Sequence, residues 1–389
     1  MFVNKEVFLF NKKLFTSESV GQGHPDKICD QISDAILDAF LKEDIYSRTA
    51  IETVATGNKL LIAGEYSSNA KNVNVVEIAK NILKELDYYH NDLQIITDLK
   101  PQSVDIARGV VLENQEIGAG DQGIMFGYAC KETPSYMPIA ISLAHDIVKL
   151  ANNLRINNKF KWAKADMKSQ VTFNYETNEI DTFLFSCQHS DDYNELEFKE
   201  HIKNNIFKPV CEKYKLNFPK KVFINPTGRF VIGGPLGDTG LTGRKIIVDT
   251  YGGYAHHGGG AFSGKDASKV DRSAAYACRW IAKNLVAANV ANEIEIQVSY
   301  AIGVAEPVSI SVETFNSSKY DNEFILDIIK NCFSLTPKNI IKELDLLKPI
   351  YSKTAYFGHF GRDDLDLPWE RLNKVKGIQE YIINKTNKK

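Results

Sequence analysis

The chain has 389 residues, enough for two or three domains of ordinary size. Hydrophobic residues make up 43% and charged residues 25% of the sequence, which excludes a largely disordered or fibrous protein. The formal net charge of −2 lacks the basic excess that nucleic-acid-binding proteins usually carry. Since no apolar run approaches the roughly 20 residues of a membrane span, we expect a soluble, cytoplasmic protein with no nucleic-acid and no membrane partner. The six scattered cysteines form no CxxC pair and predict reduced thiols, mostly buried, without a zinc site.

The apolar pattern predicts one order of elements that occurs three times. The first copy comprises helix 25–43, strands 49–56 and 59–65, helix 73–86 and strand 93–97. The second comprises helix 136–152, strands 170–175 and 180–186, helix 193–214 and strand 222–224. The third comprises helix 267–288, strands 293–300 and 308–313, and helices 324–333 and 337–346. Three copies of helix–strand–strand–helix, each preceded by a possible strand, predict an α+β protein of three similar units with antiparallel strand pairs.

Glycine is concentrated in one segment of the chain. Twelve of the 25 glycines lie between Gly228 and Gly264. Glycine lets the backbone approach a ligand closely and lets N–H groups converge on an anion. A flexible linker is the alternative, but linkers rarely interleave Arg, Lys and Asp so densely, so the pattern favours a ligand-binding loop.

The segment Gly23-His24-Pro25-Asp26-Lys27 stands where the first helix begins. A helix N-terminus presents free N–H groups and partial positive charge and can receive a phosphate. His24 and Lys27 would add donors, and Asp26 could hold a divalent metal beside the phosphates. Spacing alone does not separate this role of Asp26 from a charge that only stabilises the first helical turn.

Two further segments combine glycine with charge. The stretch 118–123, GAGDQG, reads as a tight turn that presents a carboxylate, and it does not fit a Walker A motif. The stretches 237–245 and 258–272 place four or five cations and three carboxylates among glycines, and His256-His257 between them reads as loop structure. Such an array suits a polyphosphate bridged by Mg²⁺, and a solvated charged surface is the alternative. The residues thus predict an enzyme that handles a magnesium–nucleotide polyphosphate.

Several long segments resemble, in order, those of the methionine adenosyltransferase family, also called S-adenosylmethionine synthetases. The matching segments are TSESV (16–20), GHPDKICDQISDAILD (23–38), GAGDQG (118–123), KSQVTF (168–173), GRFVIGGP (228–235) and the stretch 237–276. The resemblance runs from about residue 15 to 361. It implies three structurally similar α/β-sandwich domains related by pseudo-threefold symmetry, with mixed and antiparallel sheets. We expect these domains at 12–112, with a gating loop at about 102–112, at 122–236 and at 237–380.

The resemblance also implies the reaction. In this family, the methionine sulfur attacks C5′ of the ATP ribose and displaces the whole triphosphate, which is then hydrolysed to phosphate and pyrophosphate. The products are S-adenosylmethionine, phosphate and pyrophosphate. A catalytically silent nucleotide-binding relative is the alternative, and an ATP-dependent ligase or kinase would instead release ADP or AMP.

Site residues follow from the resemblance position by position. Catalytic roles are implied for His24, Lys168, Arg244, Lys245 and Lys265. Contacts with ATP are implied for His24, Asp166, Lys168, Arg229, Phe230, Asp238, Arg244, Lys245, Ala261 and Lys265. Contacts with methionine are implied for Glu65, Gln102, Asp121, Asp238 and Lys269. The implied metal ligands are Asp26 and Asp271 for two Mg²⁺ ions and Glu52 for K⁺. The implied assembly is a homodimer with shared active sites, paired into a homotetramer.

Overall fold

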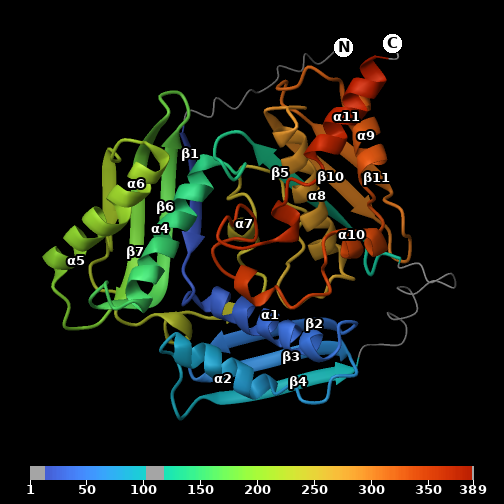
Figure 1. The fold of residues 1–389 in the computed structure, drawn as a ribbon. Helices are drawn as coiled ribbons and strands as arrows, with labels where there is room; N and C mark the ends of the chain where they lie inside the picture. Colours follow the sequence, from blue (N-terminus) through green and yellow to red (C-terminus); the bar gives the residue numbers. More distant parts are fainter. Residues whose placement is uncertain (1–13, 102–117, 388–389) are drawn as a thin grey trace, which may run out of the picture.

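The structure, a computed structural model, describes residues 14–101 and 118–387. Three sheets surround an irregular, glycine-rich segment near the middle of the molecule (Figure 1). Long helices cover one face of each sheet. The predicted gating loop, including Gln102, lies outside the described residues.

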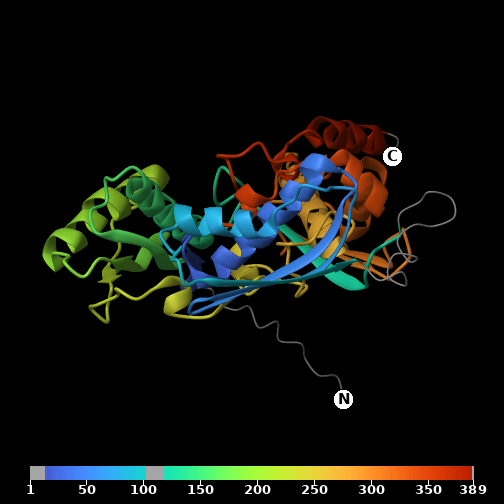
Figure 2. The same cartoon turned by 90° about the horizontal axis from the view of Figure 1, so that it is seen from below.

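The N-terminal sheet has four strands in the order β4-β3-β2-β9. Its strands are β2 (Arg48–Thr56), β3 (Lys59–Ser67), β4 (Gln94–Pro101) and β9 (Gly240–Leu241). The helices α1 (Pro25–Glu43) and α2 (Val75–Glu85) lie on one side of it, and its other face is left open by these helices (Figure 2).

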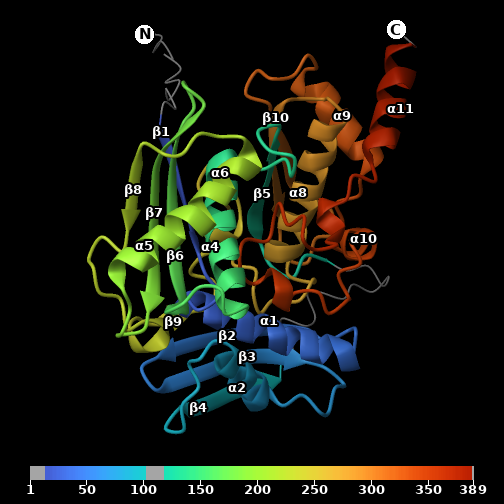
Figure 3. The same ribbon diagram turned by 60° about the vertical axis from the view of Figure 1, so that its left-hand side comes forward.

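The central sheet also has four strands, in the order β1-β6-β7-β8 (Figure 3). Its strands are β1 (Leu14–Val20), β6 (Ala163–Asn174), β7 (Glu179–His189) and β8 (Lys221–Ile224). The helices are α4 (Ile139–Ile156), α5 (Glu195–Ile202) and α6 (Lys208–Tyr214). A five-residue π-helical segment, Lys203–Phe207, joins α5 to α6, so the predicted helix over 193–214 is continuous but changes its winding midway.

The C-terminal sheet has the order β11-β10-β5 among the described residues. Its strands are β5 (Gly123–Cys130), β10 (Glu293–Tyr300) and β11 (Ser309–Glu313). The helices are α8 (Val270–Ala287), α9 (Asn322–Cys332), α10 (Pro337–Glu343) and α11 (Val375–Thr386). Helix α11 was not among the predicted elements. A short helix, α7 (Ile246–Asp249), lies in the glycine-rich segment.

The three sheets exchange strands in a cyclic manner. The N-terminal strand β1 pairs with β6 of the central sheet, β5 pairs with β10, and β9 pairs with β2. In each case the incoming strand is antiparallel to the first strand of a hairpin that the sequence predicted. The long helices α1, α4 and α8 pack on equivalent strands, so the three units are related by pseudo-threefold symmetry. Mixed and antiparallel α/β sandwiches are therefore confirmed, and each unit depends on a strand from another part of the chain.

Each unit has its own hydrophobic core. Buried side chains form three clusters, which lie under α1, α4 and α8. All six cysteines are free, as predicted, and five of them are buried. Among the helices of residues 14–101 and 118–387, none is long and apolar enough to cross a membrane.

Candidate functional site

The N-terminus of α1 lies where the central sheet and the glycine-rich segment meet. Pro25 occupies the first helical turn, and His24 caps the helix because its Nδ1 accepts a hydrogen bond from the backbone N–H of Asp26 at 3.2 Å. His24 is 2% exposed. Burial, with the nearby charges of Lys245 and Lys168, lowers the pKa of His24 to about 3. The ring is therefore neutral near pH 7, and since Nδ1 accepts, its proton lies on Nε2.

Asp26 anchors a group of cations at this helix end. Its Oδ2 lies 2.6 Å from Lys245 Nζ, and its Oδ1 lies 3.6 Å from Arg244 Nε. Oδ1 also accepts a hydrogen bond from the backbone N–H of Leu241 at 3.0 Å. Burial opposes ionisation, but the hydrogen bonds from Lys245 and Leu241 prevail and lower the pKa of Asp26. Asp26 is thus an ionised carboxylate that brings two cations to a helix N-terminus.

Asp26 is the first of four aspartates spaced four residues apart on α1, which therefore share one face of the helix. Each accepts hydrogen bonds from backbone N–H groups of distant segments. The pairs are Asp26 with Leu241, Asp30 with Gly243 at 2.8 Å, Asp34 with Gly264 at 2.9 Å, and Asp38 with Tyr351 at 3.0 Å and Ser352 at 2.8 Å. The first three aspartates therefore fix the course of the glycine-rich segment, and Asp38 holds a segment nearer the C-terminus.

Lys27 does not serve as a phosphate donor, contrary to our expectation. Its side chain is completely buried and pairs with Asp30 at 2.8 Å and with Asp249. Although burial opposes the charge, these two carboxylates raise its pKa. Two acids already hold the ammonium group inside the protein, so it cannot reach a ligand at the helix end.

A second charged cluster lies at the N-terminus of α8. Lys265 Nζ contacts Asp271 Oδ2 at 2.5 Å, and Lys269 Nζ contacts Asp266 Oδ2 at 2.5 Å. Asp271 stands in the first turn of α8, and Lys269 directly precedes that helix. Ala261 lies close by, since a Cβ added to Gly260 would come within 2.4 Å of the Asp271 carboxylate. The structure thus brings together four predicted residues: Ala261, Lys265, Lys269 and Asp271.

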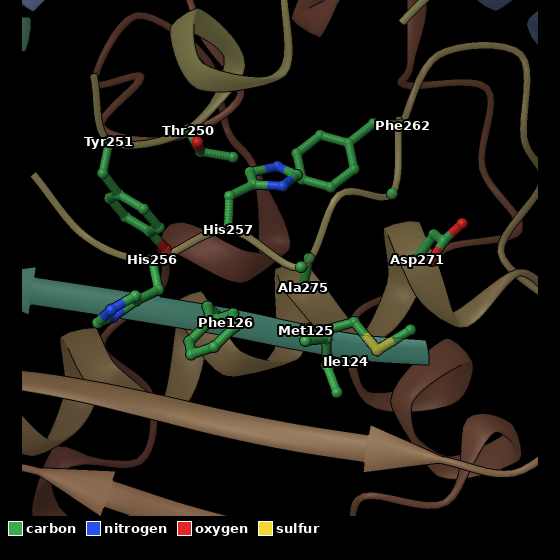
Figure 4. A pocket seen from close by; sticks show the side chains of 12 residues that line it. Ile124, Met125, Phe126, Thr250, Tyr251, His256, His257, Phe262, Asp271 and Ala275 are labelled. Carbon is green, nitrogen blue, oxygen red and sulfur yellow. The ribbon is translucent and has the colours of Figure 1, made fainter. Parts of the chain in front are cut away.

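A narrow pocket borders this second cluster (Figure 4). Residues of β5, including Met125 and Phe126, form one wall, and Asp271 stands at its side. His257 and Phe262 of the glycine-rich segment form the opposite wall. The pocket has room for about one water molecule. It is therefore too small for a nucleotide, and the candidate site consists of the charged groups around it.

Asp166 on β6 combines burial with incomplete hydrogen bonding. It is 4% exposed, and its Oδ2 accepts a hydrogen bond from the backbone N–H of Gly234 at 2.9 Å. Its Oδ1 is buried and has no hydrogen-bond partner among the described residues. Burial raises the pKa of Asp166 to about 6. A buried acceptor without a partner is costly and is typical of a site that a ligand completes.

The remaining predicted residues lie at the surface. Lys168 on β6 and Asp238 are exposed, and their charges act on Asp166. Arg229 is exposed and pairs with Asp191 at 3.0 Å, and Phe230 follows it. Three predicted acids have exposed side chains elsewhere: Glu52 on β2, Glu65 on β3 and Asp121 in the turn before β5.

The predicted metal ligands belong to separate clusters. Asp26 pairs with Lys245, whereas Asp271 pairs with Lys265. Within residues 14–101 and 118–387, no three His, Cys, Asp or Glu side chains come close enough to hold a metal ion together. The structure therefore contains two charged half-sites: one at the start of α1, around His24, and one at the start of α8, around Lys265.

Sequence reasoning did not assign the buried acids that hold these half-sites. Asp30, Asp34 and Asp249, with the buried cation Arg272, connect α1 to the glycine-rich segment and to α8. The four-residue spacing of aspartate in 26–38 was the available signal, because acidic residues on an otherwise buried helix face need partners.

Three sequence models of one family together match most of the chain. The N-terminal, central and C-terminal domains of S-adenosylmethionine synthetase match residues 12–108, 116–230 and 232–371. Among similar proteins, the S-adenosylmethionine synthase of Mycoplasmopsis synoviae is 58% identical over 96% of this chain and 99% of its own length. That of Mycoplasma mycoides is 57% identical over 95% and 97%, and that of Clostridium botulinum is 50% identical over 95% and 100%. Because three domain models of one family match in order and these relatives cover at least 95% of it, the chain belongs to the S-adenosylmethionine synthetase family.

Proposed function

We propose that the two half-sites catalyse the formation of S-adenosylmethionine from ATP and methionine, with hydrolysis of the displaced triphosphate to phosphate and pyrophosphate. The observation that carries the proposal is the convergence of Arg244 and Lys245 on the N-terminus of α1, next to the neutral His24. A helix N-terminus with two cations is a site for phosphate oxygens.

The first step needs no general base, because a thioether sulfur carries no proton. Its barrier depends on the alignment of sulfur with C5′ and on stabilisation of the leaving triphosphate. His24, with a pKa of about 3, is not charged near pH 7, and its Nε2–H can donate to a phosphate oxygen. Each well-placed donor in such a site contributes about 3 kcal/mol to the transition state. Lys168, Arg244, Lys245 and Lys265 would supply most of this stabilisation.

The other substrate contacts are assigned by their place around the half-sites. We propose that Asp166, with its unpaired buried oxygen, contacts adenosine, together with Arg229, Phe230, Asp238 and Ala261. We assign the methionine side to Glu65, Gln102, Asp121, Asp238 and Lys269.

The carboxylates fit the metal ions that we propose. Mg²⁺ prefers oxygen ligands and is usually held by one or two carboxylates together with substrate phosphates and water. Asp26 and Asp271 each supply one carboxylate that pairs with a lysine. When that lysine pairs with a triphosphate oxygen instead, the carboxylate would be free to hold one of the two Mg²⁺ ions. A bound Mg²⁺ supplies positive charge to the leaving triphosphate. Glu52, an exposed carboxylate of β2, is the proposed K⁺ ligand.

We further propose a homodimer in which each active site combines the α1 half-site of one protomer with the α8 half-site of the other. The open face of the N-terminal sheet supports this assembly, because Leu61 and Ile96 are 37% and 52% exposed there. Both Glu52 and Glu65 project from the same face of the β2–β3 hairpin. Two dimers would form the tetramer, and the protein would be cytoplasmic.

Mixing two inactive variants tests the shared site. Asp26→Ala inactivates the α1 half-site and Lys265→Ala the α8 half-site. Refolded or coexpressed as a mixture, half of the dimers are mixed, and each of these has one intact site, so activity should return to about a quarter of normal. A mixture as inactive as its components would contradict a shared site.

The interface itself is tested by Ile96→Asp, which places a charge on the open face of the sheet. This variant should be inactive and should elute as a monomer from a size-exclusion column.

A further inference from the structure

A buried ion pair joins α1 to α8 behind the α8 half-site. Arg272 Nη1 and Nη2 contact Asp34 Oδ1 and Oδ2 at 2.6 and 2.8 Å, and both residues are 0% exposed. The guanidinium also donates to the hydroxyl of Tyr276 at 3.0 Å and lies 4.2 Å from the ring centre of Tyr351. Neither charge can reach a substrate, and the assignments above give neither a role in the reaction.

The same ion pair holds the backbone on both sides of the Gly264–Lys265 peptide. Asp34 Oδ1 accepts a hydrogen bond from the N–H of Gly264 at 2.9 Å, and Arg272 Nη1 donates to the carbonyl of Lys265 at 3.0 Å. From the other side, β2 donates two hydrogen bonds to the carbonyl of Gly264. These come from Ile51 N at 3.1 Å and Thr49 Oγ1 at 2.9 Å. The backbone that carries Lys265 is therefore fixed between α1, α8 and β2.

Gly264 leaves little room for this backbone to move. Its φ of +81° is strained for any residue with a side chain, and an added Cβ would come 1.9 Å from the carbonyl oxygen of Ile51. Lys265 also forms a β-bridge with Ala50 of β2. As a result, only the side-chain torsions of Lys265 remain free, and the position of its Cα is set by the contacts of Gly264.

A second buried ion pair on α8 makes its hydrogen bonds outside the glycine-rich segment, so burial of an ion pair alone does not explain the contacts of Asp34 and Arg272 with that segment. Arg279, seven residues further along α8, makes two 3.0 Å contacts with Glu370 and is also 0% exposed. It donates to the carbonyls of Tyr128, Ser135 and Tyr136, and none of these belongs to the glycine-rich segment. On α1, Asp38 also accepts hydrogen bonds from the backbone of a distant segment, but from Tyr351 and Ser352. These groups serve as matched controls.

We propose that Asp34 and Arg272 are positioning residues for the reaction, and that they hold Lys265 where negative charge develops on the departing triphosphate. The proposal rests on the role of Lys265 proposed above. Electrostatic stabilisation requires a donor fixed in advance, because a misplacement of about 1 Å can reduce a rate by about 100-fold. The Asp34–Arg272 pair supplies this fixed position without contacting the substrate.

The test compares Asp34→Asn with Asp38→Asn, two substitutions of equal size on the same helix. In Asp34→Asn, a donating amide replaces the carboxylate oxygen that accepts from Arg272 Nη2, and the negative charge that balances the buried guanidinium is lost. We expect kcat for S-adenosylmethionine formation and the hydrolysis of added inorganic tripolyphosphate to fall by about 10-fold or more, with little change in the KM for methionine. Asp38→Asn changes a buried carboxylate that does not hold the Gly264–Lys265 backbone and should leave kcat within about twofold.

A double-mutant cycle separates positioning from a purely structural role. If Asp34 acts through Lys265, then Asp34→Asn should reduce kcat no further once Lys265→Ala is present. Losses that add fully in the double variant, or a normal kcat in Asp34→Asn alone, would overturn the proposal. Normal turnover of Lys265→Ala would overturn both this proposal and the assignment of Lys265. A normal kcat in Asp34→Asn together with a low kcat in Lys265→Ala would overturn this proposal alone, so the two failures are distinguishable. Should Asp34→Asn fail to fold, Arg272→Lys enters the same cycle with Arg279→Lys as its control.

Discussion

Replacement of Asp166 by Asn should stabilise the protein and weaken its function. The ionised carboxylate is 4% exposed, and only one of its oxygens has a hydrogen-bond partner among the described residues. Asp166→Asn keeps an oxygen for the N–H of Gly234 and removes the buried charge. Functional sites often carry such local costs, so that a substitution raises stability at the expense of activity.

The magnitude follows from the pKa of Asp166, which burial raises from 3.8 to about 6. This difference corresponds to about 3 kcal/mol at pH 7. The buried carboxyl lowers the free energy of unfolding at pH 7. The folded protein binds this proton more tightly than the unfolded chain does, so the ionisation that occurs as the pH rises through about 6 favours the unfolded chain. The gain from Asp166→Asn should be complete near pH 7, fall to about half at pH 5 and vanish below pH 4. For a chain of this length, 3 kcal/mol corresponds to about 4 °C in melting temperature.

Calorimetric melting of the wild type and the variant at pH 5 and pH 7.5 tests this reasoning. Glu380→Gln, which changes an exposed carboxylate of α11, is the control and should leave the melting temperature unchanged. With ATP varied, Asp166→Asn should raise the KM for ATP, because the proposed contact with adenosine is lost. A variant that is no more stable at pH 7.5, or equally stabilised at both pH values, would refute the assignment of the cost to the buried charge.

Three further substitutions or titrations test separate parts of the site. Lys265→Ala should lower kcat by about 100- to 1,000-fold, yet its partly exposed pair with Asp271 should contribute less than about 1 kcal/mol to stability. Mass spectrometry of the product and a thermal melt measure the two effects, and near-normal turnover would remove Lys265 from its role. Gly264→Ala should destabilise the protein by more than about 1 kcal/mol, because the new Cβ meets the carbonyl of Ile51. Denaturant unfolding measures this, and an unchanged midpoint would contradict the packing. The ring of His24, with a pKa of about 3, should show no protonation between pH 5 and 8 in nitrogen-15 NMR spectra, and a midpoint near 6.5 would contradict its buried, capping position.

Much of the fold could be predicted from local signals in the sequence. The hairpins at residues 49–65 and 293–313 and the helices that begin near residues 25 and 270 follow from apolar periodicity, and the structure places them with small shifts at their ends. The exchange of β1, β5 and β9 between sheets could not be predicted in this way. Those pairings join residues that are 100 or more positions apart, and periodicity does not specify a partner. The boundaries 12–112, 122–236 and 237–380 remain predictions.

For the site too, local signals in the sequence predicted one part, and only the three-dimensional arrangement showed the other. Glycine and charge marked the segments around His24 and Lys265 as candidates, because glycine lets backbone N–H groups converge on an anion and the neighbouring cations suit phosphate. These assignments remain predictions. Lys27 was misassigned, since a lysine beside a phosphate motif does not reveal that its side chain enters the core. Its partner Asp249 lies 222 residues away, and only the three-dimensional arrangement brings these two charges together.

The measurement that tests the central claim most directly is mass spectrometry of the products formed from ATP, methionine, Mg²⁺ and K⁺, with methionine omitted as the control. The account predicts S-adenosylmethionine that depends on methionine and equal amounts of phosphate and pyrophosphate, without ADP. ADP or AMP as the product, or ATP binding without any product, would contradict it.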